Sequence, residues 1–478
     1  MEPRFDLPAE YLQRMESMLG AEFTSFLQCY ALPAVTGLRV NTLKINPKEF
    51  TRISPFALRD IPWCTAGFQL RAEPAPAGSS PGKHPFHAAG LYYLQDPTAM
   101  AAAEILAPKP GEKVLDISAA PGGKATHLAG LMKNEGLLVT NEIHPLRVWT
   151  LAENLERCGV SHAVVLQETP QRLSSHFGAF FDRVLVDAPC SGEGMFRKSS
   201  EARQAWSTEL VHSCSARQLA LLRSAGEMVR PGGFLLYSTC TFAPEENEGV
   251  LSAFLKHSDP IGSQFEIIQT QAFPGFSPGQ SDWINDLWEG RRPPLERAVR
   301  LWPQHQVGEG HFIALLQRQD AYSDRLKEPY LFQFKEPIRK LADQFFKDSL
   351  SVKIPSNRLT LQGSYLYQVP EGLPNLDGLR VVHPGWWLGV VKKNRLEPSH
   401  ALAMGLSPDK VLRKVSFLTN SPQVQAFLHG ESLPLDAPGG WTLFTIQVNA
   451  TGLQFPLGWG KHSQGLLKNQ YPRGLRWI

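Results

Sequence analysis

The sequence predicts an α/β protein with a mostly parallel central sheet, a small α+β domain before it and a β-rich region after it. Three observations predict this class. Apolar strand-like runs alternate with helix-length stretches between about residues 98 and 318. A Pro/Gly/Ser-rich segment (residues 71–86) precedes them, and short strand-like runs separated by Gly, Pro and aromatic residues follow residue 350. At roughly 150 residues per domain, 478 residues suggest about three domains.

The first 97 residues predict the small α+β domain. Apolar spacing over residues 7–19 favours a short amphipathic helix, and the run GLRVNTLK (residues 37–44) favours a strand. Residues 71–86 are expected to form a loop or hinge at the end of this domain.

Residues 98–318 form the predicted central domain. Helices at 144–157 and 209–229 lie between strand candidates, and such alternation implies right-handed βαβ units. No clear helix separates the last two strand candidates, so we expect an antiparallel hairpin at the sheet edge, interrupted by a surface loop over 271–299. The strand candidates are 114–117, 137–141, 163–166, 183–186, 234–238, 265–268 and 312–316.

The region after residue 318 differs in character. Residues 319–390 predict a connector, with a charged helix over 327–349, followed by a first C-terminal subdomain. Residues 391–478 predict a second, β-rich domain.

Composition limits the kind of protein. The 42% of apolar residues is enough for ordinary cores, and the 19% of charged residues argues against a disordered or strongly acidic chain. No stretch approaches the ~20 apolar residues of a membrane span, and the first residues lack a signal-peptide pattern. Six scattered cysteines without a CxxC pair argue against a disulfide scaffold and against zinc. We therefore expect a soluble, cytoplasmic monomer without metal or membrane association.

A glycine-rich segment, DISAAPGGKAT (residues 116–126), follows the first central strand and opens a helix. A Walker A loop is disfavoured, because Ser118 and Ala125 replace its first Gly and its Ser/Thr, and a G-x-G-x-x-G dinucleotide fingerprint is absent. Two interpretations are left: an S-adenosylmethionine loop at the topological switch point of the sheet, or a tight turn without ligand. In the first, Glu142 at the end of the next strand is placed to accept both ribose hydroxyls.

Two further motifs end neighbouring strands. DAPCSGEG (residues 187–194) follows the fourth strand and YSTC (237–240) the fifth, so Cys190 and Cys240 are expected beside the glycine-rich loop. The other four cysteines are interpreted as small buried apolar residues, and a disulfide between Cys190 and Cys240 is disfavoured in a reducing compartment.

A thiol beside a methyl donor suits methylation of carbon 5 of a pyrimidine. Thiolate addition at carbon 6 converts the ring into an enamine, whose carbon 5 then attacks the sulfonium methyl group. Loss of the carbon-5 proton and elimination of the thiol release the product.

Together, DISAAPGGK, DAPCSGEG and YSTC resemble motifs of the Nop/Sun family of RNA 5-methylcytosine methyltransferases. The similarity extends to RVNTLK (39–44), YYLQDPTAM (92–100) and RLWPQHQVGEGHFIALL (300–316). The C-terminal extension, including GWWLGVVKKNRLEPSHALAM (385–404), is similar to the bacterial branch that acts on small-subunit (16S) rRNA. The resemblance implies a Rossmann-like S-adenosylmethionine-dependent domain, an RNA-binding-like domain over 1–97 and a PUA-like RNA-binding domain over 391–478.

The resemblance also implies roles for individual residues. Cys240 would be the nucleophile and Cys190 would assist release. Asp187 would lie between cofactor and target base and donate to, or protonate, the cytosine ring nitrogen, unless it only caps its own turn. Glu142 would bind the ribose and Arg147 would approach the same pocket. The methionine part of the cofactor would be held by Ala119, Ala120, Pro121, Gly122, Gly123, Lys124 and Ala125.

One position departs from the family pattern. Many members carry an Asp near the adenine amino group, whereas this chain reads QETP at 167–170. We expect Thr169, Glu168 or a backbone group to make that contact.

Several basic side chains are candidates for phosphate contacts. Each alone is ordinary surface charge, but together at one end of the sheet they favour a nucleic-acid track. They are Arg39, Lys44, Arg197, Lys198, Arg291, Arg292 and the run KKNR at 392–395. Trp386 and Trp387 are interpreted as the core of a small β-domain.

The predicted substrate is a cytosine in single-stranded or locally opened rRNA, because the base must leave its stack to reach a thiol. The alternatives are a tRNA cytosine methyltransferase and a catalytically idle RNA-binding assembly factor. The presence of Cys190, Cys240 and Asp187 together disfavours the idle factor.

Overall fold

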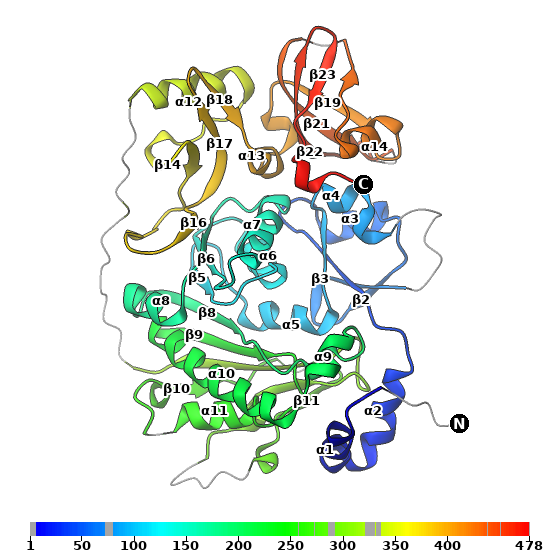
Figure 1. The fold of residues 1–478 in the computed structure, drawn as a ribbon, viewed down its shortest axis with the longest axis vertical. Helices are drawn as coiled ribbons and strands as arrows, with labels where there is room; N and C mark the ends of the chain where they lie inside the picture. Colours follow the sequence, from blue (N-terminus) through cyan, green and yellow to red (C-terminus); the bar gives the residue numbers. More distant parts are fainter. Residues whose placement is uncertain are drawn as a thin grey trace.

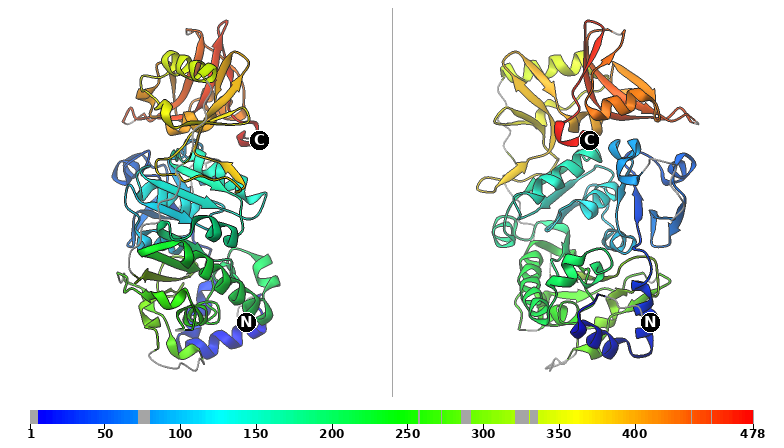
Figure 2. Two further views of the ribbon diagram at one scale, coloured as in Figure 1. Left: turned by 90° about the vertical axis from the view of Figure 1, so that its left-hand side faces the viewer. Right: turned by 45° about the vertical axis from the view of Figure 1, so that its right-hand side comes forward.

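The computed structural model describes residues 6–71, 80–256, 258–271, 273–284, 292–320, 330, 336–436, 438–449 and 451–477. Figures 1 and 2 show an elongated molecule, with the C-terminal units at one end of its long axis and the N-terminal helices near the other. The central sheet lies between them. No helix among these residues combines the length and the apolar character needed to cross a bilayer.

The central sheet confirms the predicted α/β class. Within the described residues it has ten strands, in the order β11-β12-β13-β9-β8-β5-β6-β7-β16, with β10 also paired to β13. Its middle is parallel and consists of β5 (Lys113–Asp116), β6 (Leu137–Asn141), β7 (Ala163–Leu166), β8 (Phe181–Asp187) and β9 (Val229–Thr239).

Helices cover both faces of these parallel strands, so neighbouring residues of one strand enter two different cores. Val114 belongs to the core under α5 (Pro97–Leu106), α6 (Gly123–Leu131) and α7 (Arg147–Arg157). Leu115 belongs to the core under α8 (Pro170–Phe177), α10 (Thr208–Met228) and α11 (Glu248–Leu255). Burial on both faces explains why the strands read as continuous apolar runs.

Both edges of the sheet extend further than predicted. The hairpin partners β10 (Phe265–Ile267) and β13 (His311–Arg318) pair antiparallel as expected. However, β12 (Val299–Leu301) and β11 (Phe276–Pro278) continue the sheet beyond β13, so the predicted surface loop contains a strand. At the opposite edge β16 (Val381–His383), from the C-terminal region, pairs antiparallel with β7.

The N-terminal region divides into two parts. A four-stranded sheet has the order β2 (Leu58–Ile61), β3 (Cys64–Leu70), β1 (Gly37–Val40), β4 (Tyr92–Leu94), with α3 (Pro47–Ile53) and α4 (Pro85–Ala88) beside it. In contrast, α1 (Ala9–Leu19) and α2 (Phe23–Tyr30) pack on the central domain, where Tyr11 and Phe26 join a core with Phe196 and Trp206.

The C-terminal region forms two small sheets. The first is β14 (Leu359–Gln362), β15 (Tyr365–Gln368), β17 (Trp386–Lys392) and β18 (Arg395–Pro398), with α12 (Glu336–Ser349) and α13 (His400–Gly405). The second is β19 (Lys414–Leu418), β21 (Gly440–Gln447), β22 (Gln454–Ser463), β23 (Leu466–Asn469) and β20 (Leu433–Pro434), with α14 (Pro422–His429).

The predicted boundary at 390/391 falls inside β17, so both sides of it lie in one sheet. Trp386 is part of the core of this unit, as predicted, and Trp387 packs against that core. The predicted connector helix is described from Glu336 onward, and its earlier residues lie outside the described part, Tyr330 excepted.

Candidate active site

The carboxyl ends of β5, β6, β8 and β9 surround a cavity of about 530 Å³. This is the position where open α/β sheets bind ligands. The cavity brings together side chains from every predicted motif: Ala120, Lys124, Glu142, Arg147, Asp187, Cys190 and Cys240. Sequence reasoning did not identify several other lining residues, namely Asp96, Asn141, Ile143, His144, Glu309 and His311.

The glycine-rich loop is held by hydrogen bonds from the elements around it. Ala119 N donates to Asn141 O at 2.8 Å, and Arg147 Nη2 donates to Ala120 O at 2.8 Å. Gly122, at the start of α6, has a φ of +112°, a conformation that residues with a Cβ rarely adopt. The loop therefore presents a fixed backbone at the helix N-terminus.

Lys124 and Asp187 form an ion pair in this cavity. Lys124 Nζ lies 2.7 Å from Asp187 Oδ2, and their side chains are 10% and 33% exposed. Burial alone would lower the pKa of Lys124, but Asp187 and the nearby Cys240 raise it, so the lysine is charged. Lys124 therefore contributes a charged side chain to the cavity, in addition to its backbone in the glycine-rich loop.

Asp116 is a buried carboxyl that sequence reasoning did not select. It ends β5 and is fully buried. Burial, followed by the charge of Asp187, raises its pKa to about 8. Because Asp116 is neutral near pH 7, Asp187 is the carboxylate that balances the positive charge of Lys124.

The two predicted cysteines lie side by side. Cys190 Sγ and Cys240 Sγ are 3.2 Å apart, and both side chains are partly exposed. Three contacts fix the loops that carry them: Ser191 N to Glu246 Oε2 at 3.0 Å, Ser191 Oγ to Thr241 Oγ1 at 2.9 Å, and Gly194 N to Cys240 O at 2.8 Å. The hydrogen bond with Cys240, followed by burial, raises the pKa of Cys190, so Cys190 is held as a thiol.

Glu142, directly after β6, and Arg147, the first residue of α7, both line the cavity. Glu142 Oε1 accepts a hydrogen bond from His144 N at 2.9 Å, and Oε2 lies 3.6 Å from Arg147 Nη1. Glu142 is almost fully buried, whereas the Arg147 side chain is 55% exposed. These contacts orient a carboxylate whose two oxygens suit a pair of hydroxyl groups.

The residues expected near adenine are used differently. Thr169 caps α8, since its Oγ1 accepts from Arg172 N at 3.4 Å. Glu168 is buried and accepts from Arg380 N at 2.7 Å while pairing with Arg172 at 2.8 Å. Neither residue is part of the cavity lining, which instead includes Pro170 and Ile143.

Several predicted phosphate contacts are structural residues instead. Arg39 is buried and donates to Gly123 O and Thr126 Oγ1, so it supports the start of α6. Lys44 donates to Ala89 O at 2.7 Å. Arg197 is paired with buried Glu309, and Lys198 with Asp96 at 2.7 Å. Those interpretations are wrong for Arg39, which is buried, and for Arg197, whose side chain is only 8% exposed.

The remaining basic candidates are exposed where the structure describes them. Arg292 is exposed, and the KKNR run lies exposed at the turn between β17 and β18. Arg291 lies outside the described residues.

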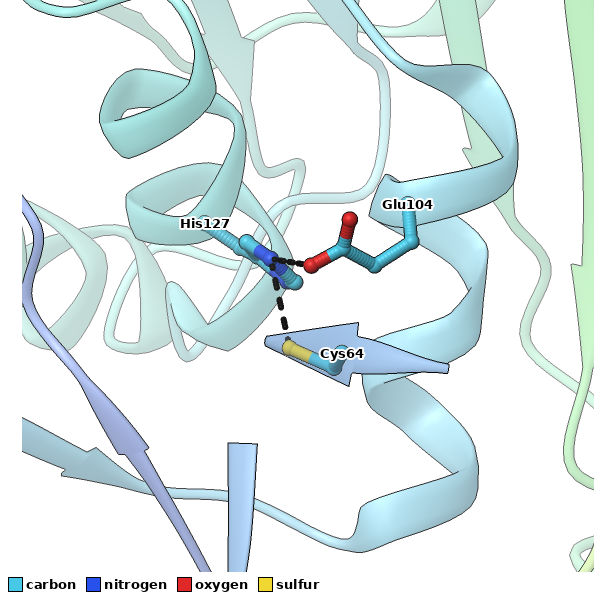
Figure 3. A group of neighbouring side chains, drawn as sticks. All are labelled: Cys64, Glu104 and His127. Carbon is cyan, nitrogen blue, oxygen red and sulfur yellow. Dashed lines mark hydrogen bonds and ion pairs between the residues drawn. The ribbon is translucent and has the colours of Figure 1, made fainter. Parts of the chain in front are cut away.

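A second cluster of polar side chains joins the N-terminal sheet to the central domain. Figure 3 shows Cys64 of β3, Glu104 of α5 and His127 of α6 pointing toward one another. His127 Nε2 lies 3.0 Å from Glu104 Oε1 and 3.9 Å from Cys64 Sγ. Burial, followed by Arg39, lowers the pKa of His127 to about 4, so this histidine is neutral at pH 7. Because these residue types also bind zinc, the expectation of a metal-free protein stays a prediction.

Four protein-family models match this chain, and the residues they match correspond to its N-terminal, central and two C-terminal regions. The family model "16S rRNA methyltransferase RsmB/F" matches residues 103–317. Models for the N-terminal domain of 16S rRNA methyltransferase RsmF, its first C-terminal domain and its PUA domain match residues 7–97, 344–406 and 414–477.

Relatives resemble the chain over nearly its whole length. "Ribosomal RNA small subunit methyltransferase F" of Vibrio vulnificus (strain YJ016) is 31% identical over 487 residues, covering 98% of this chain and 97% of the relative. The protein of the same name from Shewanella baltica (strain OS195) is 31% identical over 471 residues, covering 94% and 92%.

Two solved structures each resemble about two thirds of the chain. A methyltransferase homologue protein from Pyrococcus horikoshii is 28% identical with a TM-score of 0.53, covering 65% of this chain and 100% of that one. NSun6 from Pyrococcus horikoshii, solved with SFG, shares the fold at 21% identity and a TM-score of 0.55, covering 66% and 99%. With relatives above 30% identity matched almost from end to end, the chain belongs to the 16S rRNA methyltransferase RsmB/F family.

Proposed function

We propose that this protein methylates carbon 5 of a cytosine in 16S rRNA, with S-adenosylmethionine as methyl donor and a covalent intermediate on Cys240. The observation that carries the proposal is the 3.2 Å approach of Cys190 and Cys240 in the cavity that also holds Glu142 and the glycine-rich loop. The relatives are named as small-subunit rRNA methyltransferases, which supports the substrate class.

The cavity residues fit S-adenosylmethionine. The cavity's volume of about 530 Å³ is within the range of small-molecule sites. Glu142 would accept the ribose hydroxyls, and the backbone from Ala119 to Ala125 would hold the methionine part. The bound cofactor would supply an electrophilic methyl group on its sulfonium sulfur.

The chain's residues divide the chemistry between them. Cys240 attacks carbon 6 of the cytosine as a thiolate, forming the C–S bond. Because Asp187 is paired with Lys124, it acts as an acceptor suited to the exocyclic amine of cytosine, and Lys124 stabilises negative charge on the ring. In this proposal both Asp187 and Lys124 contact the cytosine, and not Asp187 alone.

Product release uses the second cysteine. When the carbon-5 proton leaves and the C–S bond breaks, Cys240 departs as a thiolate. The Cys190 thiol, 3.2 Å away, donates a hydrogen bond to that sulfur and so stabilises the departing thiolate. The carbon-5 proton passes to water, so Cys240 ends as the thiolate with which it attacked and Cys190 ends as a thiol.

Alanine variants of the two cysteines test the proposal. Cys240→Ala should abolish methylation and form no covalent RNA adduct. Cys190→Ala should attack and transfer the methyl group, then accumulate a denaturant-resistant protein–RNA complex. Denaturing gel electrophoresis with labelled rRNA separates these results, with Cys214→Ala as the matched control that keeps wild-type activity. An adduct in Cys240→Ala and none in Cys190→Ala would reverse the two roles.

Bisulfite mapping of RNA from cells with and without the protein tests the substrate. Loss of a 5-methylcytosine from 16S rRNA supports the proposal. Loss from tRNA instead would favour the tRNA alternative, and no loss at all would favour an idle assembly factor. An rRNA substrate would place the enzyme in the cytoplasm of a bacterium, and a monomeric state stays a prediction.

A further inference from the structure

Three exposed apolar side chains lie in the segment directly after Glu142, and one of them lines the cavity. Ile143 lines the cavity and is 57% exposed, Leu146 is 73% exposed and Trp149 is 53% exposed. All three belong to the segment between Glu142 and the first turn of α7. Single exposed apolar residues are common, but three in seven residues beside a binding cavity indicate a contact surface.

A row of rings continues from this segment into the first C-terminal unit. The ring centroids of Trp149 and His383 are 6.2 Å apart, those of His383 and Trp387 are 6.1 Å apart, and those of Trp387 and Tyr365 are 5.7 Å apart. The four rings come from α7, β16, β17 and β15. They therefore cross the seam where β16 joins the central sheet, between the central domain and the C-terminal end of the molecule in Figure 1.

The two ends of this row are open to solvent. Trp149 is 53% exposed and Tyr365 is 46% exposed, whereas the His383 side chain between them is 13% exposed. The inner rings therefore support the outer rings, about half of whose surface is open to solvent. We call Leu146, Trp149, His383, Trp387 and Tyr365 the seam surface.

Positive charge flanks the seam surface. Arg380, which precedes β16, is exposed. The side chains of Arg147 and Arg172 are 55% and 58% exposed, and each pairs with a buried glutamate, Glu142 and Glu168 respectively. Exposed arginines beside exposed rings match the needs of a single-stranded nucleic acid, whose phosphates bind cations and whose bases stack on aromatic side chains.

We propose that the seam surface binds the single-stranded RNA next to the target nucleotide, with bases stacked on Trp149 and Tyr365. The inference rests on the proposed function only in taking RNA as the substrate. It assigns the RNA a path from the cavity, across α7 and β16, to the first C-terminal unit. Stacking of this kind is tolerant of sequence, so the surface holds the flanking RNA and leaves selection of the cytosine to the cavity.

Trp149→Ala and Tyr365→Ala in the full chain test this path. Fluorescence anisotropy with a short labelled oligouridine, without cofactor, should show a Kd at least about fivefold higher for each variant, the loss expected for one base stack. Trp149→Phe should keep most of the affinity because it retains an aromatic face. Leu418→Ala removes a 47% exposed side chain of β19 and is the matched control with unchanged affinity.

Two results would overturn the proposal. One is an oligouridine affinity that stays within twofold of wild type in both alanine variants, with thermal unfolding unchanged. The other is weakened binding to the small ribosomal subunit with unchanged oligouridine binding, which would make the seam surface a protein-docking site. Because the assay contains no cofactor and no chemistry, a failure of the methylation proposal leaves this result unaffected.

Discussion

Glu142 illustrates what one residue contributes to the proposed cofactor site. Its carboxylate is 5% exposed and is oriented by His144 N and Arg147. An oriented, buried carboxylate loses little freedom when it accepts hydrogen bonds, so its contribution to binding should be large.

Glu142→Ala should weaken S-adenosylmethionine binding by about 10- to 100-fold, because bonds to a charged acceptor contribute about 1.5–3 kcal/mol. Isothermal titration calorimetry measures this directly. Glu153→Ala removes an exposed carboxylate of the same helix, α7, and should bind as wild type does. An unchanged Kd in folded Glu142→Ala would refute the ribose assignment.

At the scale of elements, a buried ion pair fastens the antiparallel edge of the central sheet to a helix. Arg300 of β12 and Glu248, the first residue of α11, have side chains that are 2% and 0% exposed. Arg300 Nε lies 2.8 Å from Glu248 Oε1, and its guanidinium lies 4.8 Å from the Trp283 ring. Glu248 Oε1 also accepts from Gln280 N at 2.9 Å, which anchors the segment after β11.

Arg300→Met should lower the free energy of unfolding by about 3–5 kcal/mol, because it leaves the Glu248 carboxylate buried without its counter-charge. The double variant Arg300→Met/Glu248→Gln should cost less than Arg300→Met alone, since it removes the orphaned charge. Urea unfolding followed by fluorescence measures the free energy of unfolding of the wild type, the two single variants and the double variant. If the double variant loses as much free energy of unfolding as Arg300→Met and Glu248→Gln lose separately when added together, the two residues do not act as a pair.

At the scale of the whole molecule, the C-terminal region is part of the catalytic sheet. Its strand β16 covers the edge of β7, and Arg380 N bonds to buried Glu168. The cavity-lining residues, by contrast, all lie between Asp96 and His311.

Two shortened chains should therefore behave differently. A chain ending at residue 320 loses β16 and exposes the edge of β7, so its Tm should fall several degrees below that of a chain ending at residue 412. Both should bind S-adenosylmethionine, and both should methylate rRNA poorly because the PUA domain is absent. Differential scanning fluorimetry measures the two Tm values, and isothermal titration calorimetry measures binding of S-adenosylmethionine. Equal Tm values would show that β16 adds no stability, and full methylation by either chain would refute the requirement for the PUA domain.

Local signals in the sequence were enough to predict the parallel core and the meeting of its motifs. Alternating apolar runs and helices define parallel strands, and the carboxyl ends of parallel strands share one edge. Glu142, Cys190 and Cys240 each follow such a strand, so their convergence depends only on this order and the structure places all three at one cavity. The resemblance to the Nop/Sun family added the expected roles, which the cysteine and Glu142 variants test.

Only the tertiary structure decided which charged and polar groups face the cavity and which are spent on packing. Arg39 and Arg197 look like phosphate ligands in the sequence, but folding buries them against Thr126 and Glu309, residues far away in the chain. The Lys124–Asp187 pair and the join between β16 and β7 likewise unite distant segments. The sequence determined the order of strands and the chemistry carried at their ends, because those properties are local. The partners of buried charges depend on how separate elements pack in three dimensions, and a one-dimensional pattern contains no such distances.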